Sequence, residues 1–145
     1  MVLIDVNVLL YAHREDTAKH GECRAWLEAL AGSGEAFGIS DLVLSSVLRI
    51  ATHPRVFSPP TPLDRAIEFC EAIRNLPGCV IISPGARHWQ IFLRLCRAAE
   101  ARGNLVPDAY LSALAQESGC VLVTTDRDFS RFPGVRWNPP QLERD

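Results

Sequence analysis

The chain alternates short apolar runs with longer segments in which apolar residues recur at helical spacing. The short runs are VLID at the start, then AFGIS, CVIIS and CVLVTT, and a weaker GVRW near the end. Most are rich in β-branched residues and lie between turn-forming residues. This pattern predicts short buried strands, the first of which ends near Asp5.

Between these runs, apolar residues lie three and four positions apart, as on one face of an amphipathic helix. Glycine and proline residues limit the segments. The pattern predicts helices over about 17–31, 40–51, 61–75, 86–102 and 107–118, with Ser40 as a cap. The stretch HPRVFSPPTP is typical of a loop. Strands that alternate with helices predict an α/β domain with a mainly parallel sheet.

Length and composition fit one globular domain over residues 1–145, of which 48% are hydrophobic and 22% charged. No apolar run reaches the roughly 18–20 residues of a membrane span. No basic segment precedes the first apolar run, as it would in a signal peptide, so we expect a cytoplasmic protein. The five cysteines are scattered without a C-x-x-C pair, which argues against a metal site made of thiolates.

The charge balance restricts how the protein could meet nucleic acid. A net charge of −2 argues against a protein that grips nucleic acid over its whole surface, but it leaves room for a local basic face. All basic residues except Lys19 are arginine. The planar guanidinium of arginine is well suited to phosphate groups.

Three aspartates from distant parts of the chain fall where strands end or helices begin. Asp5 closes the first strand, Asp126 follows CVLVTT, and Asp108 stands next to Pro107 in the first turn of a helix. Ligands of parallel sheets bind at the carboxyl ends of strands, so these acids are expected to converge there. Clustered carboxylates need a cation to stay ionised. Their hard oxygen atoms favour Mg²⁺ or Mn²⁺.

Each acid taken alone also has an ordinary structural explanation. Asp5 or Asn7 can cap a helix after the first strand. Asp108 can favour a helix N-terminus through the macrodipole. Asp126 and Asp128 can be turn residues. Their joint placement at one edge of the sheet favours a single site over three coincidences.

An ordered set of motifs resembles a known family. DVNVLLYA, LVLSSVLRIATHPRVF, VPDAYLSALAQ and VLVTTDRDF together resemble a PIN-domain ribonuclease, and more narrowly the VapC toxins of type II bacterial toxin–antitoxin modules, especially the mycobacterial type. The resemblance covers essentially the whole chain. It implies a three-layer α/β/α fold and a nuclease that uses Mg²⁺ or Mn²⁺ to cleave tRNA or rRNA, which inhibits translation and growth. It also implies neutralisation by a VapB-type antitoxin, a homodimer, a toxin–antitoxin hetero-oligomer and no membrane.

The resemblance assigns roles to residues of this chain. Asp5, Asp108 and Asp126 match the family's catalytic acids, which bind the metal. The supporting polar positions are Asn7, Ser46, Thr124, Thr125 and Asp128. The residues expected to contact RNA are Arg49, His53, Arg55 and Arg127, with Arg14 and Arg131 as further cations near the edge of the site.

One position departs from the family pattern. The helix after the second strand usually carries a glutamate where this chain has Ser46. A neutral hydroxyl cannot supply the same charge, although it can hold a water molecule near a metal. Asp41 lies five residues earlier, about 140° away around a helix, so it is a poor replacement. Ser46 therefore puts metal affinity, or occupancy of a second metal site, in doubt.

Three functions remain open at this point. The first is a metal-dependent endoribonuclease toxin. The second is a PIN-like module that binds RNA or protein with weakened catalysis, which Ser46 keeps open. The third is another aspartate-based phosphohydrolase of the haloacid-dehalogenase type. That class needs D-x-D after the first strand, where this chain has D-V-N, and a later lysine, whereas Lys19 comes too early. A Rossmann or P-loop enzyme fits less well, because no glycine-rich loop follows the first strand.

Overall fold

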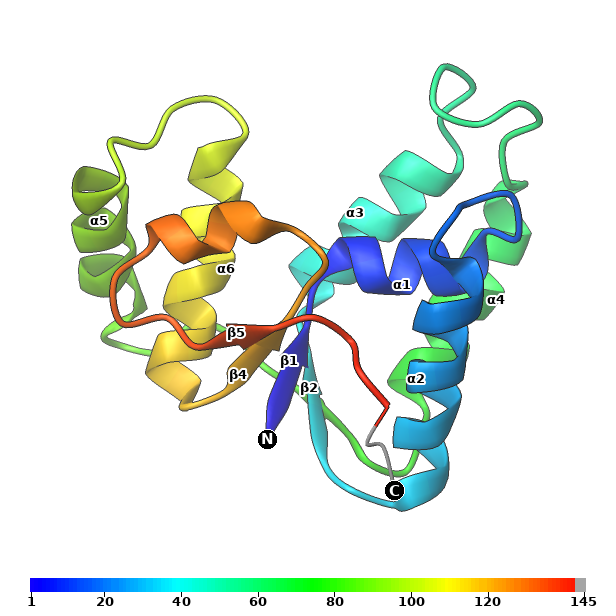
Figure 1. Ribbon diagram of the computed structural model, residues 1–145, viewed down its shortest axis with the longest axis horizontal. Helices are drawn as coiled ribbons and strands as arrows, with labels where there is room; N and C mark the ends of the chain where they lie inside the picture. Colours follow the sequence, from blue (N-terminus) through cyan, green and yellow to red (C-terminus); the bar gives the residue numbers. More distant parts are fainter. Residues whose placement is uncertain (143–145) are drawn as a thin grey trace.

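A computed structural model describes residues 1–142 of the protein, and its centre is a five-stranded sheet in which every neighbouring pair of strands is parallel (Figure 1). The strand order is β3-β2-β1-β4-β5. The strands are β1 Val2–Ile4, β2 Phe37–Ile39, β3 Cys79–Ile81, β4 Val121–Val123 and β5 Trp137–Asn138. The predicted parallel α/β fold is therefore confirmed.

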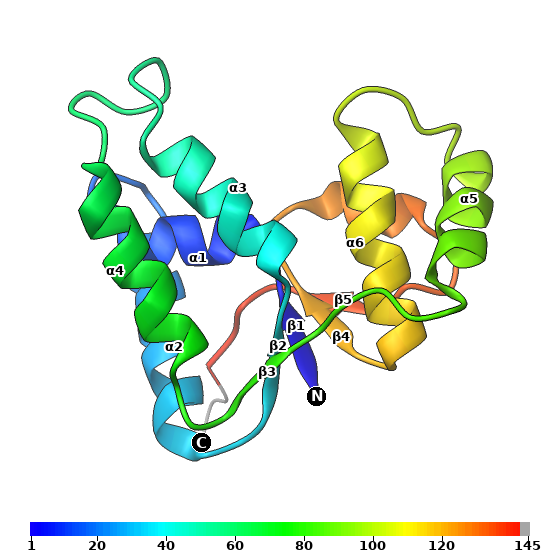
Figure 2. The same ribbon diagram turned by 180° about the vertical axis from the view of Figure 1, so that it is seen from behind.

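The helices form layers on both sides of the sheet. Their bounds are α1 Val6–His13, α2 His20–Ser33, α3 Asp41–Ala51, α4 Leu63–Arg74, α5 His88–Ala98 and α6 Leu105–Ser118, with a 3₁₀ helix at Arg127–Arg131. Figure 1 shows α1 to α4 on one side of the strands and α5 and α6 on the other, and Figure 2 shows the same division from behind. This follows from right-handed crossovers, because the chain moves outward from β1 to β3 and then returns past β1 to β4.

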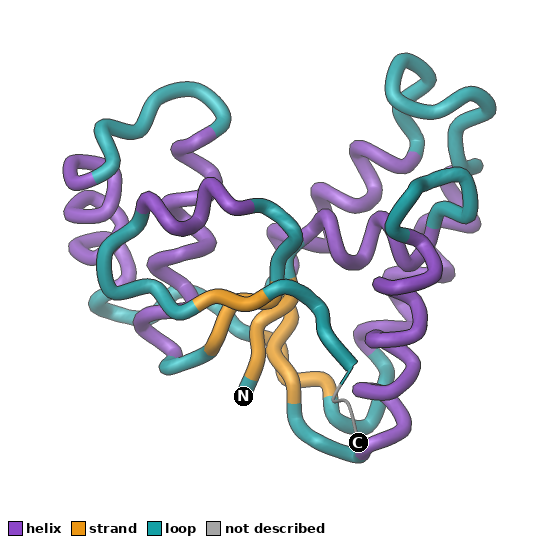
Figure 3. The backbone as a smooth tube through the Cα atoms, in the orientation of Figure 1, coloured by secondary structure: helices purple, strands orange, loops and turns teal. Residues whose placement is uncertain are grey.

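The change of direction in strand order determines where a site can form. It lies between β1 and β4, which pair in the register Ile4 with Val123. The carboxyl ends of these two strands therefore stop side by side, at the kind of crevice where parallel sheets bind ligands. In Figure 3 the loop between α3 and α4 and the loop between α5 and α6 rise on the two sides of this end of the sheet.

The elements differ from the predicted ones mainly at their ends. The second helix runs from His20 to Ser33 instead of 17–31, and α5 spans only His88–Ala98 of the predicted 86–102. GVRW contributes only its last residue to a strand. CVIIS was predicted to be a buried strand, and this is wrong for β3, whose Val80 is 41% exposed. β3 is an edge strand, and the side chain of Val80 points to the opposite face of the sheet from the half-buried Cys79 and Ile81, a face that is less covered there.

The core lies between the sheet and both helical layers. Its largest fully buried side chains include Leu3, Ile4, Phe37, Ile39 and Leu122 from the central strands. Burial of this strand set explains why β1 and β4 hold their carboxyl ends in fixed register. Among residues 1–142, no helix has the length and hydropathy needed to cross a membrane.

Candidate active site

Asp5 is the first residue after β1 and the cap of α1. Its backbone N–H donates to the carbonyl of Val123 at 3.0 Å, which continues the pairing of β1 with β4. Its Oδ1 accepts a hydrogen bond from the backbone N–H of Val6 at 2.7 Å. The carboxylate is only 4% exposed, although it sits at the end of a strand. Asp5 therefore does cap a helix, but only through Oδ1, and its second oxygen, Oδ2, has other partners.

The second oxygen of Asp5 belongs to a network with residues from β4 and α1. Thr124, which is fully buried, donates its hydroxyl to Asp5 Oδ2 at 2.7 Å. Asn7 Nδ2 donates to the same Oδ2 at 2.9 Å and to Thr124 Oγ1 at 3.1 Å. The Asn7 side-chain oxygen accepts from the backbone N–H of Thr125 at 3.1 Å. These bonds fix the orientation of the Asp5 carboxylate before any ligand binds.

Asp126 is tied to the same network through its backbone. Its N–H donates to Thr124 Oγ1 at 3.0 Å, and its Oδ1 accepts from the N–H of Asp128 at 2.9 Å. Asp126 thus caps the 3₁₀ helix Arg127–Arg131. It is a turn residue as well as a half-buried acid beside Asp5.

Asp108 reaches this end of the sheet from the opposite helical layer. It lies in the first turn of α6, which begins at Leu105, two residues before the predicted start at Pro107. Burial raises the pKa of Asp108 to about 7, and the negative charges of Asp5, Asp126 and Asp128 add to this rise. Four carboxyl groups from three parts of the chain therefore lie close enough for their charges to influence the ionisation of Asp108.

The pKa of Asp5 is also raised. Burial is the main cause, and the charge of Asp126 adds to it. Hydrogen bonds from Thr124, Val6 and Asn7 act in the opposite direction, because they stabilise the ionised carboxylate. Asp5 is therefore a buried acid whose ionised form depends on three donors.

The donor set fits a hard divalent cation. Among residues 1–142, no three His, Cys, Asp or Glu side chains are grouped closely enough to enclose a metal ion by themselves. Mg²⁺ does not need such a cage, because it keeps several waters and is usually bound by one or two carboxylates together with substrate phosphate. Burial and, in addition, repulsion by Asp5, Asp126 and Asp128 disfavour the ionised form of Asp108, and a bound cation would stabilise that form.

Ser46, which stands where the family usually has glutamate, and Asp41, the possible replacement, have different surroundings in the structure. Ser46 is half-buried on α3, which packs against α1. Asp41 is engaged by the guanidinium of Arg74, with Arg74 Nε at 2.9 Å from Asp41 Oδ1 and Nη2 at 3.1 Å from Oδ2. This ion pair lowers the pKa of Asp41 and leaves it outside the acidic cluster.

The basic residues expected near RNA fall into two groups. Exposed side chains with no ion pair among residues 1–142 are Arg49, Arg55, Arg127 and Arg131, and His53 is exposed as well. Arg14 differs, because its side chain is 13% exposed and binds Asp16 and Thr61. The sequence suggested Arg14 as a cation near the edge of the site and gave no sign of its contact with Thr61, which lies 47 residues away.

Comparisons with known proteins identify the family of the chain and other proteins with its fold. Residues 2–135 match the family model of the PIN domain. The chain is 44% identical over 142 residues to ribonuclease VapC25 of Mycobacterium tuberculosis, an alignment that covers 98% of this chain and 100% of the relative.

Two solved structures share the fold at 19% identity. VapBC2 from Rickettsia felis, bound to a DNA fragment from its promoter, has a TM-score of 0.70 and covers 96% of this chain and 98% of its own. VapC20 of Mycobacterium tuberculosis, a toxin that cleaves the sarcin–ricin loop, has a TM-score of 0.64, and the match covers 94% of this chain and 99% of the VapC20 chain. The chain belongs to the PIN-domain family and, within it, to the VapC proteins.

Proposed function

We propose that this protein is a metal-dependent endoribonuclease toxin that cleaves cellular RNA, tRNA or rRNA, in the cytoplasm. The observation that carries the proposal is the convergence of Asp5, Asp126 and Asp108 where the strand order changes. Burial, with a further contribution from the neighbouring acids, raises the pKa of Asp108 to about 7. The name of the 44% identical relative, a ribonuclease, supports the same activity. Cleavage would inhibit translation and growth.

Asp5 and Asp108 would hold Mg²⁺ or Mn²⁺, and Asp126 would act as a third ligand or hold a metal-bound water. When bound, a divalent cation activates the attacking water and neutralises charge that develops on the scissile phosphate. Thr124 and Asn7 keep the Asp5 carboxylate oriented through hydrogen bonds of 2.7 and 2.9 Å. Asp108 must release its proton before it can act as a ligand, so its raised pKa links metal binding to pH.

The proposed partner is a VapB-type antitoxin. Several solved structures with this fold are VapBC complexes, some of them bound to DNA. Such a partner would offer an amphipathic segment to an apolar groove and a basic side chain to the acidic site. The proposal includes a homodimer and a toxin–antitoxin hetero-oligomer.

The second candidate is a PIN-like module with weakened catalysis that acts by binding RNA or protein. The observation in its favour is Ser46, a neutral and half-buried residue at the position where the family usually has glutamate. Under this alternative the fold and the RNA-binding surface remain, but metal occupancy is too low for rapid cleavage.

Cleavage assays separate the two candidates. Purified protein is incubated with total cellular RNA in Mg²⁺, in Mn²⁺ or in a chelator, and the new RNA ends are mapped by sequencing. We expect defined cleavage sites only with a metal, and none with Asp5→Asn. Asp64→Asn, which removes an exposed acid from the first turn of α4, is the control and should cleave normally. Unchanged cleavage by Asp5→Asn, or in chelator, would contradict the nuclease proposal.

A further inference from the structure

The segment between Asp41 and Asp64 contains no acidic residue. Its charged side chains are Arg49 and Arg55, and it also carries His53. The segment comprises nearly all of α3 and the loop that follows it. We call this loop, residues 52–62, the α3–α4 loop. In Figures 1 and 2 this loop rises beyond the carboxyl end of the sheet, on the α1–α4 side of the site. The C-terminal half of α3 and the α3–α4 loop therefore carry basic side chains and no acid, on the α1–α4 side of the acidic site.

The α3–α4 loop exposes side chains suited to nucleic acid. His53, Arg55 and Val56 are all exposed, Val56 by 54%. The backbone N–H of Arg55 donates to His53 Nδ1 at 3.1 Å, so the other ring nitrogen, Nε2, is available as a donor. A guanidinium, an imidazole donor and an apolar side chain together can contact phosphate and unpaired bases.

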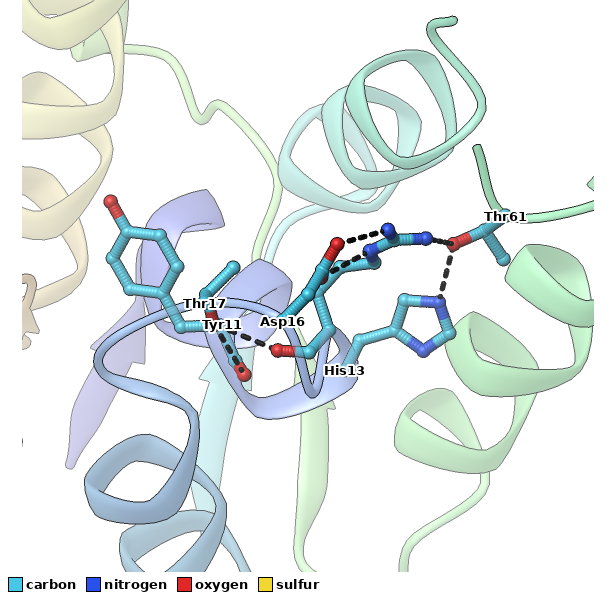
Figure 4. Close-up of polar contacts among 6 residues, drawn as sticks. Tyr11, His13, Asp16, Thr17 and Thr61 are labelled. Atoms are coloured by element: carbon cyan, nitrogen blue, oxygen red, sulfur yellow. Dashed lines mark hydrogen bonds and ion pairs between the residues drawn. The ribbon is translucent and has the colours of Figure 1, made fainter. Parts of the chain in front are cut away.

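A cluster at the base of the α3–α4 loop holds it in place. Arg14 Nη1 donates to Thr61 Oγ1 at 3.2 Å, and Arg14 Nε donates to Asp16 Oδ1 at 2.9 Å. The guanidinium carbon also lies 4.2 Å from the centroid of the Phe57 ring. Figure 4 shows His13, the last residue of α1, pointing toward Thr61, with His13 Nε2 3.1 Å from Thr61 Oγ1, while Asp16 holds the guanidinium of Arg14 from the other side. We call these contacts the Arg14 clasp.

The Arg14 clasp uses the whole guanidinium. One side chain binds a carboxylate, a hydroxyl and an aromatic ring, and it is only 13% exposed. The other surface arginines that pair with acids, Arg24 and Arg74, are 54% and 41% exposed. Arg14 therefore has little surface left for phosphate, and its position suits it to hold the α3–α4 loop.

We propose that Arg14, as a positioning residue, holds the α3–α4 loop, with His53 and Arg55, in the position in which the loop binds RNA. This inference rests on the proposed ribonuclease function and on the RNA contacts expected of His53 and Arg55, and it adds the residue that positions them. RNA is favoured over a protein partner because the segment carries Arg49, Arg55 and His53 and no acid, so its charge complements a polyanion. Carboxylates repel a polyanion, so an RNA whose backbone approaches the acidic site needs a basic surface elsewhere on the protein to hold it.

The test measures binding without cleavage. A fluorescein-labelled RNA stem-loop is titrated in chelator with the full chain, and fluorescence anisotropy gives Kd. The variants are Arg14→Ala, Arg55→Ala and their double mutant. Arg24→Ala is the matched control, because it also removes an arginine paired with an acid. We expect each single variant to raise Kd about tenfold. The double mutant should be no weaker than either one, because both remove the same contact, and Arg24→Ala should leave Kd unchanged.

Two further measurements separate positioning from folding. Arg14→Lys keeps the charge but lacks the fork and the ring contact, so it should bind as weakly as Arg14→Ala. In cleavage assays these variants should raise KM and leave kcat close to the wild-type value. If Arg14→Ala does not fold, as judged by circular dichroism, Thr61→Val removes one partner of the Arg14 clasp and serves in its place.

The possible failures are distinguishable. An unchanged Kd in Arg14→Ala, or a double mutant whose loss is the product of the two single losses, overturns the inference while leaving the nuclease proposal intact. Loss of antitoxin binding with unchanged RNA binding also overturns it, because the α3–α4 loop would then be a protein-binding surface. A wild-type protein that neither binds nor cleaves RNA overturns the proposed function itself.

Discussion

The hydroxyl of Thr124 donates to Asp5 Oδ2 at 2.7 Å and so joins two residues 119 positions apart in the sequence. Both residues stand one position beyond the paired ends of β1 and β4. A carboxylate at the end of a hydrophobic strand is tolerated there because it accepts three hydrogen bonds from neighbours fixed by the sheet. Without them, burial of that charge would be strongly unfavourable.

Thr124→Val tests this relationship directly. The substitution keeps the shape of the side chain but removes the donor to Asp5 and the acceptor for the N–H of Asp126. We expect the free energy of unfolding to fall by about 1–3 kcal/mol, because buried polar groups lose their partners. Cleavage should fall more than for Thr124→Ser, which keeps the hydroxyl. Urea denaturation and initial cleavage rates measure the two effects, and equal stability of the Val and Ser variants would contradict the prediction.

Asp108→Asn should change how stability depends on pH. The pKa of Asp108 is raised from 3.8 to about 7 in the folded protein, so its ionised form is disfavoured there. The stability that comes from the protonated form is complete below the ordinary pKa and is lost as pH rises through about 7. In chelator, we expect Asp108→Asn to be more stable than wild type at pH 8, on the order of 1 kcal/mol after allowance for solvent screening.

The comparison is made by thermal unfolding at several pH values. The advantage of Asp108→Asn should shrink steadily from pH 8 to pH 4. A difference in Tm that is the same at both ends of this range would show that the pKa of Asp108 is not raised in the folded protein.

Metal binding should release a proton near neutral pH. A cation that binds Asp108 requires its ionised form, so Mn²⁺ affinity should increase from pH 6 to pH 8 and then level off. Isothermal titration calorimetry in buffers of different ionisation enthalpy measures both the affinity and the protons released. Asp5→Asn should bind Mn²⁺ weakly at every pH, whereas Asp64→Asn should match the wild type. Tight binding by Asp5→Asn would remove Asp5 from the metal site.

Ser46→Glu should strengthen metal binding, because it restores an acid at the position where the family usually has one. Ser45→Glu is the matched control, since it adds the same charge one position away on an exposed part of α3. We expect an increase in Mn²⁺ affinity of roughly tenfold for Ser46→Glu and little change for Ser45→Glu. Equal increases in Mn²⁺ affinity for both variants would indicate that the added negative charge acts at a distance, without binding the metal. No increase for either variant would indicate that the site with Ser46 binds Mn²⁺ as well as one with glutamate.

Much of the fold was predictable because its signals are local. Short apolar runs bounded by turn residues predicted β1, β2 and β4, and Ser40 does cap α3, with its Oγ 3.2 Å from the backbone nitrogen of Leu42. The edge position of β3 was not predictable in this way. Exposure of Val80 depends on what covers its face of the sheet at this edge, and neither that cover nor the strand order is encoded in a local pattern.

Local sequence patterns and the family resemblance indicated the residues of the candidate site, with Asn7 and Thr124 among its supporting positions, and the type of element that carries each acid. The hydrogen bonds from Thr124 and Asn7 to Asp5, the ion pair of Arg74 with Asp41 and the contact of Arg14 with Thr61 became known only from the folded chain. The physical reason is that secondary structure follows from neighbouring residues. Hydrogen-bond partners and pKa shifts depend on distances between segments, and these are fixed only when strands pair and helices pack.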